Sequence, residues 1–330
     1  MNSDCRQSGS ALIAVLCLIF TAGMLITAVA AMSQYNTVSL AAHTALQRSF
    51  YINEGCASRI QWLIEADRTL YATAILGDMD YSDYAEDRYL ADGVIHQLDY
   101  YGTPVEFVIC DAASGYDFSA QNYLNSLEWM KVGFERDTEW TDRLTQFGNR
   151  IGDYIDSDDD LAVDGMEYGE YEELGREPLP RNAAIQFREE LFYLPDAVEL
   201  LPPDSDGRLT LYRLIPPENT SDLSGTPSLF SASPLLLMNY CNLTEEEAGK
   251  VMEALELWRR ERIQLSDQLD TLLLNSLNSL SRQESGSYTV VIRPPQGSKR
   301  PSRRLVFSFT ASGIGGPADG TMHYLEWLWF

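Results

Sequence analysis

The sequence predicts an α+β fold in which a long N-terminal α-helix packs on an antiparallel β-sheet, with a large α-helical domain inserted within the sheet. Residues 10–32 form an apolar run that continues as a helical pattern to about Ala66. Two strand patterns follow, then a region of helical periodicity, and then three more strand patterns. The simplest packing builds one sheet on the long helix from the two early and the three late strands.

The N-terminal segment has a short polar head that ends at Gly9. Residues 10–32 carry no charge, and a helix of about 22 apolar residues is roughly 30 Å long, enough to cross a bilayer. Ala28-Val29-Ala30 could instead serve as a signal-peptidase site, which would leave a secreted protein without an anchor. Because a signal core spans only roughly 7 to 15 residues, the longer run favours a transmembrane helix.

Beyond this segment, apolar residues recur at spacings of three, four and seven, which is typical of an amphipathic helix. The pattern predicts a stem helix to about Ala66 with one face buried. The spacing leaves open whether the stem also contacts other subunits or packs only on its own globule. The residues that carry the pattern are Val38, Ala42, Ala45, Ile52, Cys56, Ile60 and Leu63.

Two period-two runs, 94–98 and 105–109, flank a segment with Gly102 and Pro104 and predict a hairpin. Helical periodicity then begins, and we place a domain boundary near Ser119. The first helical stripe comprises Leu144, Phe147, Ile151 and Tyr154.

Later in the helical region, Thr244 and Glu247 form a capping box that starts a helix, and residues 233–240 predict a short helix before it. Strand patterns return at 288–292, 304–309 and 324–330. The predicted organisation is therefore a stem helix with the first strands over 33–118, an inserted α-helical domain over 119–281, and C-terminal strands over 282–330.

Charge and composition exclude several function classes. The chain has 49 acidic against 24 basic residues and a net charge of -25, which argues against binding to nucleic acid. The sequence has no P-loop, no G-x-S-x-G and no H-E-x-x-H motif, and its histidines, His43, His96 and His323, are scattered. We therefore expect a protein that is not an enzyme. One disulfide bond between two of the three residues Cys56, Cys110 and Cys241 is possible, but the spacing does not assign the pair.

Gly9 directly before an apolar helix resembles the prepilin-peptidase site of type IV pilins and type II secretion pseudopilins. The resemblance implies that a prepilin leader, residues 1–9, is removed between Gly9 and Ser10, and that Ser10 becomes a methylated N-terminus. The fifth residue from Ser10 is Ala14, where most members have glutamate. A carboxylate at that depth costs about 2.5–3.5 kcal/mol without a partner. In pilin filaments the partner is the N-terminal ammonium of the preceding subunit, so a tip subunit can lack the acid.

The absent glutamate and the order of helix, hairpin, helical block and three strands together resemble the general secretion pathway protein K family of minor pseudopilins. That family carries a large α-helical insertion in a pilin-like fold. Residues 152–158, 167–171 and 193–197 are also similar to its helical domain.

The resemblance implies a single-pass inner membrane protein with its C-terminal domains in the periplasm, at the tip of the pseudopilus of a type II secretion system. There it would form a ternary tip complex with two other minor pseudopilins, contact the major pseudopilin, initiate filament assembly and support protein export. Two alternatives stay open: a minor type IV pilus subunit, and a single-span periplasmic binding protein.

An acidic segment, residues 156–167, suggests a metal site. Its carboxylates occupy the first, third, fifth, ninth and twelfth places of an EF-hand-like loop, but Leu161 stands where an EF-hand needs glycine. A standard EF-hand is therefore not expected, and the alternatives are Ca²⁺ held in another geometry and a solvated acidic loop. Members of the resembled family bind calcium, which implies Ca²⁺ without identifying its ligands. The candidates are Asp156, Asp158, Asp160, Asp164 and Glu167.

Overall fold

The computed structural model describes residues 4–71, 88–112, 114–118, 122–132, 138–176, 178–185, 188–201, 212–213, 226–295, 297, 304–310 and 323–329. The chain forms two compact units. The first comprises Met1–Ile52 with Gln296–Arg303, and the second comprises Asn53–Pro295 with Arg304–Phe330.

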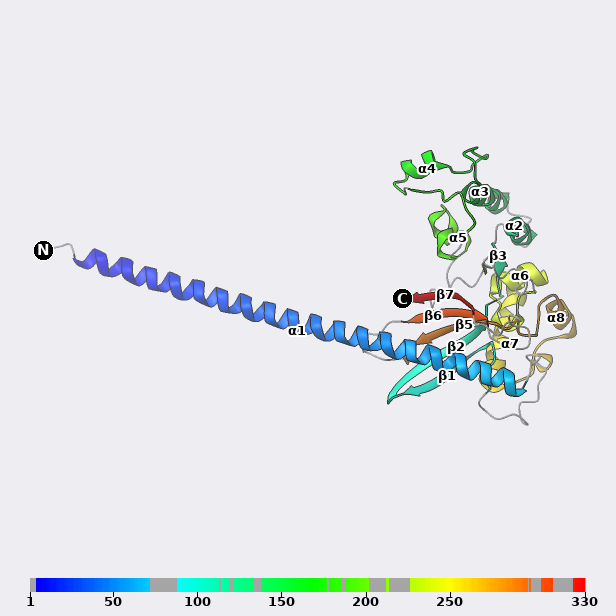
Figure 1. Ribbon diagram of the computed structural model, residues 1–330, viewed down its shortest axis with the longest axis horizontal. Coiled ribbons are helices and arrows are strands. Elements are labelled where there is room, and N and C mark those ends of the chain that lie inside the picture. The colour runs from blue at the N-terminus through cyan, green and yellow to red at the C-terminus, as the bar shows by residue number, and fades with distance from the viewer. Residues whose placement is uncertain are drawn as a thin grey trace. The chain divides into compact units, whose positions relative to one another are not determined.

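Figure 1 labels the α-helices and β-strands of the chain except β4. The helices are α1 (Asp4–Tyr71), α2 (Tyr123–Val132), α3 (Thr138–Ile155), α4 (Tyr168–Glu173), α5 (Ala197–Leu200), α6 (Pro234–Cys241), α7 (Glu245–Glu261) and α8 (Thr271–Ser276). The strands are β1 (Asp92–Tyr100), β2 (Thr103–Asp111), β3 (Tyr116–Asp117), β4 (Tyr212–Arg213), β5 (Ser287–Arg293), β6 (Leu305–Thr310) and β7 (His323–Trp329).

Of the described residues, one helix, α1, is long and apolar enough to cross a membrane. Every side chain from Ala11 to Ala41 is exposed. Two hydroxyls in the apolar part bond within the helix: Thr21 Oγ1 donates to the carbonyl of Leu18 at 3.0 Å, and Thr27 Oγ1 donates to that of Met24 at 2.9 Å. Because hydrocarbon offers no hydrogen-bond partner, this internal pairing suits a membrane-spanning segment.

Strands from both ends of the second unit form one five-stranded sheet in the order β1-β2-β5-β6-β7 (Figure 1). All neighbouring strands in it are antiparallel. The pairing of β2 with β5 sets Phe107 opposite Ile292 and Ile109 opposite Val290, which joins the early hairpin to the late strands. This arrangement confirms the predicted α+β fold, with the helical block inserted between β2 and β5.

Two kinds of side chain alternate along the central strands. One face carries apolar pairs, such as Val290 with Phe307, and the buried part of α1 packs on this side through Arg68, whose Nε donates to the Tyr288 hydroxyl at 2.7 Å. The opposite face carries hydroxyl pairs, including Thr289 Oγ1 with Ser308 Oγ at 2.8 Å. Pairing satisfies these buried hydroxyls, so both faces of the strands can be covered.

The stem helix runs to Tyr71, five residues beyond the predicted end at Ala66. Of the predicted buried stripe, Cys56 and Ile60 are fully buried and Leu63 is half-buried, and Ala57 and Ile64 complete the buried face. Val38 was wrongly placed on a buried face, because it is 69% exposed.

Cys56 and Cys241 are buried free thiols and so take no part in a disulfide. Burial raises the pKa of Cys56 to about 11, which makes it a poor nucleophile.

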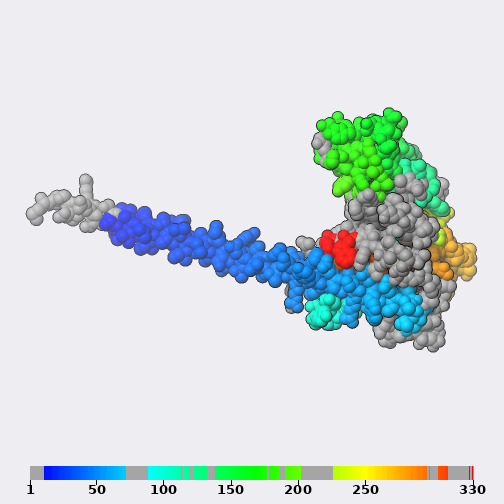
Figure 2. Space-filling view, in the orientation of Figure 1, coloured from blue at the N-terminus to red at the C-terminus, as the bar shows by residue number. Residues whose placement is uncertain are grey.

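The helical block contains two hydrophobic cores. One brings together side chains from α2 to α5, including the predicted stripe of Leu144, Phe147, Ile151 and Tyr154, and residues of α3, α4 and α5 gather into one lobe (green in Figure 2). The other is built by α6, α7 and α8.

The predicted helix starts in this block are also found. Thr244 Oγ1 accepts the N–H of Glu247 at 3.3 Å, and the Glu247 carboxylate accepts the N–H of Thr244 at 2.9 Å, so the capping box is present. At the start of α6, Ser233 Oγ accepts the N–H of Leu236 at 3.2 Å, so Ser233 caps this helix without a reciprocal bond. The predicted boundary near Ser119 lies outside the described residues.

Burial on α1 can be tested with two neighbouring residues. Ile60→Ala should lower the free energy of unfolding by about 2–5 kcal/mol, because Ile60 is fully buried. Trp62→Ala should change it by no more than about 0.5 kcal/mol, because Trp62 is 65% exposed on the other side of the helix. Urea unfolding of the full chain in detergent measures both. Equal losses in the two variants would contradict the placement of the helix.

Candidate functional site

The predicted processing site lies at the start of α1. Gly9 and Ser10 are within the helix, whose backbone is described from Asp4 onwards, and Ala14 is exposed on it. Cleavage between Gly9 and Ser10 and the meaning of the apolar residue at position 14 remain predictions.

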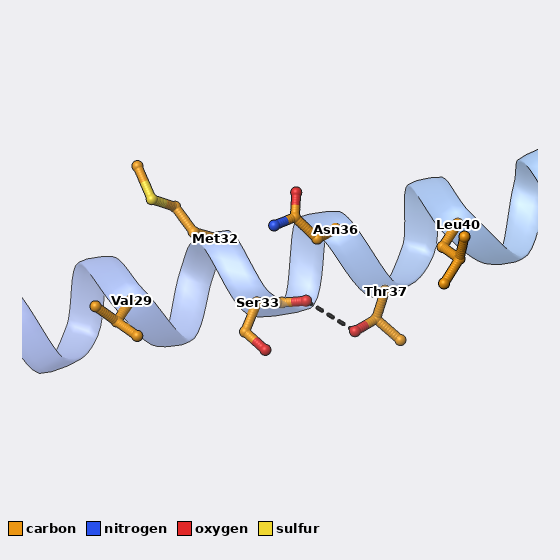
Figure 3. A pocket seen from close by; sticks show the side chains of 6 residues that line it. All are labelled: Val29, Met32, Ser33, Asn36, Thr37 and Leu40. Atoms are coloured by element: carbon orange, nitrogen blue, oxygen red, sulfur yellow. Dashed lines mark hydrogen bonds between the residues drawn. The ribbon is translucent and has the colours of Figure 1, made fainter.

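Large apolar side chains recur on α1 every eleven residues: Leu18, Val29, Leu40 and Tyr51. All four are exposed, and because eleven residues make about three helical turns, they lie on one side of the helix. Figure 3 shows the stretch from Val29 to Leu40, where six side chains line a shallow groove and Thr37 Oγ1 donates to the Ser33 carbonyl at 2.8 Å. We call Leu18, Val29, Leu40 and Tyr51 the apolar stripe.

In the second unit, Trp62 continues the same spacing and is also exposed. Its neighbours at two residues on either side, Ile60 and Ile64, are fully buried. In a helix, two residues correspond to about 200°, so Trp62 lies opposite the face that packs on the globule. An exposed tryptophan at such a position is a candidate contact for another protein.

A second candidate site is the loop between α3 and α4, residues 156–167, which we call the acidic loop. It folds over a buried carboxylate of α3: Asp153 Oδ2 accepts the N–H groups of Met166 at 2.8 Å and Ala162 at 3.2 Å. A Cβ atom on Gly165 would lie 1.9 Å from the same oxygen. Glycine at 165 is therefore what lets the loop close on Asp153.

The five predicted ligands differ in how far their side chains are buried. Asp158, Asp160 and Asp164 are exposed, whereas Asp156 is half-buried and has one buried carboxylate oxygen, Oδ1, without a hydrogen bond. Glu167, at the N-cap of α4, is only 6% exposed. Neither of its carboxylate oxygens accepts a hydrogen bond of normal geometry.

Within the described residues, neither Asp156 nor Glu167 forms an ion pair. Burial raises the pKa of Glu167 to about 7, and repulsion from Asp153 and Asp156 adds to the effect. Burial also raises the pKa of Asp156, with Asp158 and Asp153 adding repulsion. Either a proton or a cation would relieve this repulsion. The donors are carboxylate oxygens, which suit a hard cation such as Ca²⁺.

Among the described residues, however, no group of three or more histidine, cysteine or acidic side chains is drawn together in a form that could hold a metal ion. The ligand set stays a prediction. Sequence reasoning missed Asp153 and Gly165. The spacing of Asp153 and Asp156, three apart at the end of one helix, was the available signal.

Comparisons with known proteins find a likeness among solved structures but none among family models or curated sequences. Among solved structures, the chain is similar to a chain of the crystal structure of the GspK-GspI-GspJ complex from the enterotoxigenic Escherichia coli type 2 secretion system. The TM-score is 0.49 at 10% sequence identity, over 86% of this chain and 96% of that one.

The closure of the acidic loop gives a prediction. Gly165→Ala should lower the free energy of unfolding by about 1–3 kcal/mol, because the added methyl group displaces Asp153 and leaves a buried carboxylate without its hydrogen bonds. Gly169→Ala is the control. Its Cβ would have no heavy atom within 4 Å, and alanine in α4 should be neutral or stabilising by up to about 1 kcal/mol. Thermal unfolding of both variants measures the difference, and equal midpoints would contradict it.

Proposed function

We propose that the protein is a minor pseudopilin of a type II secretion system, placed at the tip of the pseudopilus. It is anchored in the inner membrane by α1, and its C-terminal domains lie in the periplasm. There it initiates filament assembly with two other minor pseudopilins, is followed by the major pseudopilin, and supports protein export. The proposal rests on the structure of α1. Its apolar N-terminal part is exposed, and the same helix continues without a break into a C-terminal part that is buried against the protein's own globule.

The exposed residues beyond the apolar segment support assembly through the stem. Tyr51 follows Met32 by nineteen residues, which is about 28 Å along a helix, so it lies outside the hydrocarbon that residues 10–32 would span. Leaving large apolar side chains in water is unfavourable by about 25 cal/mol per Å². A helix from a neighbouring pilin-like subunit would cover Tyr51. Trp62, on the part of the stem that belongs to the second unit, is also exposed and would likewise be covered by a neighbouring subunit.

Ala14 supports a position at the tip. An exposed alanine makes no demand for a positive charge inside the membrane, so the subunit needs no neighbour ahead of it. In this proposal prepilin peptidase cleaves between Gly9 and Ser10, and methylation of Ser10 follows.

The test is co-purification of the full chain with minor pseudopilins, in cells that express prepilin peptidase. We expect a ternary complex with two pilin-like partners and an N-terminus at Ser10. Trp62→Ala should weaken recovery about tenfold, equivalent to about 1.4 kcal/mol, since truncated interface tryptophans commonly cost at least that much. Leu272→Ala is the control, because Leu272 is 81% exposed but lies on α8.

Several outcomes would contradict the proposal. A chain that starts after Ala31 would be a secreted protein, and one that keeps Met1 and purifies alone would fit a single-span periplasmic binding protein. Recovery with type IV pilus subunits instead of pseudopilins would assign the protein to that filament.

For the acidic loop, calcium binding follows from the same resemblance, and the orphaned oxygens of Glu167 and Asp156 support it. These two side chains would hold the ion together with the exposed Asp158, Asp160 and Asp164. A bound Ca²⁺ would neutralise the buried charge and fix the loop between α3 and α4.

The calcium hypothesis predicts opposite effects with and without the ion. Glu167→Gln removes a buried charge, so without calcium its thermal midpoint should equal or exceed that of the native chain, whereas its stabilisation by calcium should be lost. Asp156→Asn should also reduce the calcium shift. Glu172→Gln, an exposed change on α4, is the control and should keep it. A full calcium shift in Glu167→Gln would remove Glu167 from the ligand set.

A further inference from the structure

The shallow groove on the exposed part of α1, in the first unit, has the geometry of a helix-packing site. Three apolar and three polar side chains line it, all of them exposed and all within about three turns of the helix (Figure 3). The lining residues are Val29, Met32, Ser33, Asn36, Thr37 and Leu40.

The spacing of these side chains produces two consecutive holes of the kind that a facing helix fills. Such a hole is formed by four residues at positions i, i+3, i+4 and i+7, and it accepts one side chain of the other helix. Positions 29, 32, 33 and 36 form the first hole, and positions 33, 36, 37 and 40 form the second. Ser33 and Asn36 belong to both holes. Because α1 keeps its backbone hydrogen bonds inside the helix, it offers no edge to an extended strand, and a second helix is the occupant that fits.

Much of this groove lies beyond the reach of lipid. In the proposed anchoring, residues 10–32 span the hydrocarbon, so Asn36 lies about 6 Å and Leu40 about 12 Å past its edge along the helix axis. Leu40 is 67% exposed, and its contact with water is unfavourable. A protein surface therefore has to cover this end of the groove.

The part of α1 around the groove carries no charge. Residues 7–47 contain no aspartate, glutamate, lysine or arginine, so the uncharged stretch continues fifteen residues past Met32. A facing side chain that brought a charge would lose its water without meeting a counter-charge, which is costly. The helix that fills the groove therefore presents an uncharged face.

Asn36 differs from the threonines of the same helix in what its side chain can bond to. Thr37 Oγ1 donates to the Ser33 carbonyl at 2.8 Å, and Thr44 Oγ1 donates to the Leu40 carbonyl at 2.8 Å. Within the described part of the chain, the Asn36 amide makes no hydrogen bond (Figure 3). This amide has two donor hydrogens and one acceptor oxygen, and water serves them while the groove is open. Once a helix covers the groove, that helix has to supply a partner, because a buried amide without one is costly.

We propose that Asn36 sets the register in which an uncharged helix of a neighbouring pilin-like subunit packs on α1. This helix places an amide or hydroxyl side chain opposite Asn36 and apolar side chains opposite Val29 and Leu40. A single asparagine in an otherwise apolar helix contact fixes the register at a cost in stability, because every shifted register leaves the amide unpaired. The inference rests on the proposed function, which supplies the neighbouring subunit, and it adds the residue that selects the alignment and the chemistry of the partner.

The test is photo-cross-linking in cells that express the full chain with two minor pseudopilins and prepilin peptidase. The photoreactive amino acid p-benzoylphenylalanine replaces Thr44, which is exposed one turn beyond Leu40, so the six lining residues stay native. Mass spectrometry then maps the cross-linked residues on the partner. In the native chain, one turn of the partner helix should give at least about tenfold more product than the adjacent turns, equivalent to about 1.4 kcal/mol.

Two matched variants separate register from affinity. Asn36→Leu should keep or increase the total cross-linked product, since an apolar contact replaces the amide, but the preference for one turn should fall below about threefold. Gln34→Leu is the control. It makes the same change from an amide to leucine at an exposed position that does not line the groove, about 200° around the helix from Asn36, and it should keep the native pattern.

The outcomes distinguish this inference from the proposed function. If the ternary complex is recovered but Asn36→Leu still reacts at one turn, loses its cross-link, or behaves like Gln34→Leu, the register role of Asn36 is wrong and the proposed function stands. A cross-link to a second copy of this chain, or to no protein, overturns the assigned occupant. Recovery of no complex with minor pseudopilins rejects the proposed function and this inference with it.

Discussion

The pairing of β2 with β5 is the interaction on which the rest of the second unit depends. It joins residues 103–111 to residues 287–293 and closes a sheet across the whole helical block. Without it, neither the early hairpin nor the late strands would have enough neighbours to be stable, because isolated hairpins are marginal in water. The buried face of α1 in this unit, which includes Cys56, Ile60 and Ile64, needs this complete sheet as its packing surface.

The same closure explains why polar side chains are buried at the two ends of the insertion. The chain leaves the sheet after Asp111 and returns near Glu284. Ser285, the residue after Glu284, donates two hydrogen bonds to the Asp111 carboxylate, and Glu284 itself accepts the N–H of Ala91. Backbone N–H groups at such a crossover lack strand partners and must be paired by side chains. Carboxylates serve that purpose at Ala91 and Ser285, and Arg68 supplies the compensating positive charge.

Much of the fold could be predicted from local periodicity. The strands at 94–98, 105–109 and 288–292 lie inside β1, β2 and β5, and the capping box at Thr244 starts α7 as its residue types require. Local pattern could not predict the contact of Arg68 with Glu284, because the two residues are 216 positions apart. Nor could it separate Glu167, which is buried at the N-cap of α4, from Asp158 and Asp160, which are exposed, since all three fit the same loop spacing. The two short strands β3 and β4 escaped prediction because two residues carry no periodicity.

The eleven-residue interval of the apolar stripe has a geometric consequence. Eleven residues exceed three turns of an ideal helix by a small angle, so Leu18, Val29, Leu40 and Tyr51 drift gradually around α1. A rod that kept touching each of them would have to wind around α1 in a right-handed supercoil, opposite to the left-handed twist of heptad coiled coils. The eleven-residue spacing of these four side chains therefore determines the handedness of any helical bundle that packs on this surface.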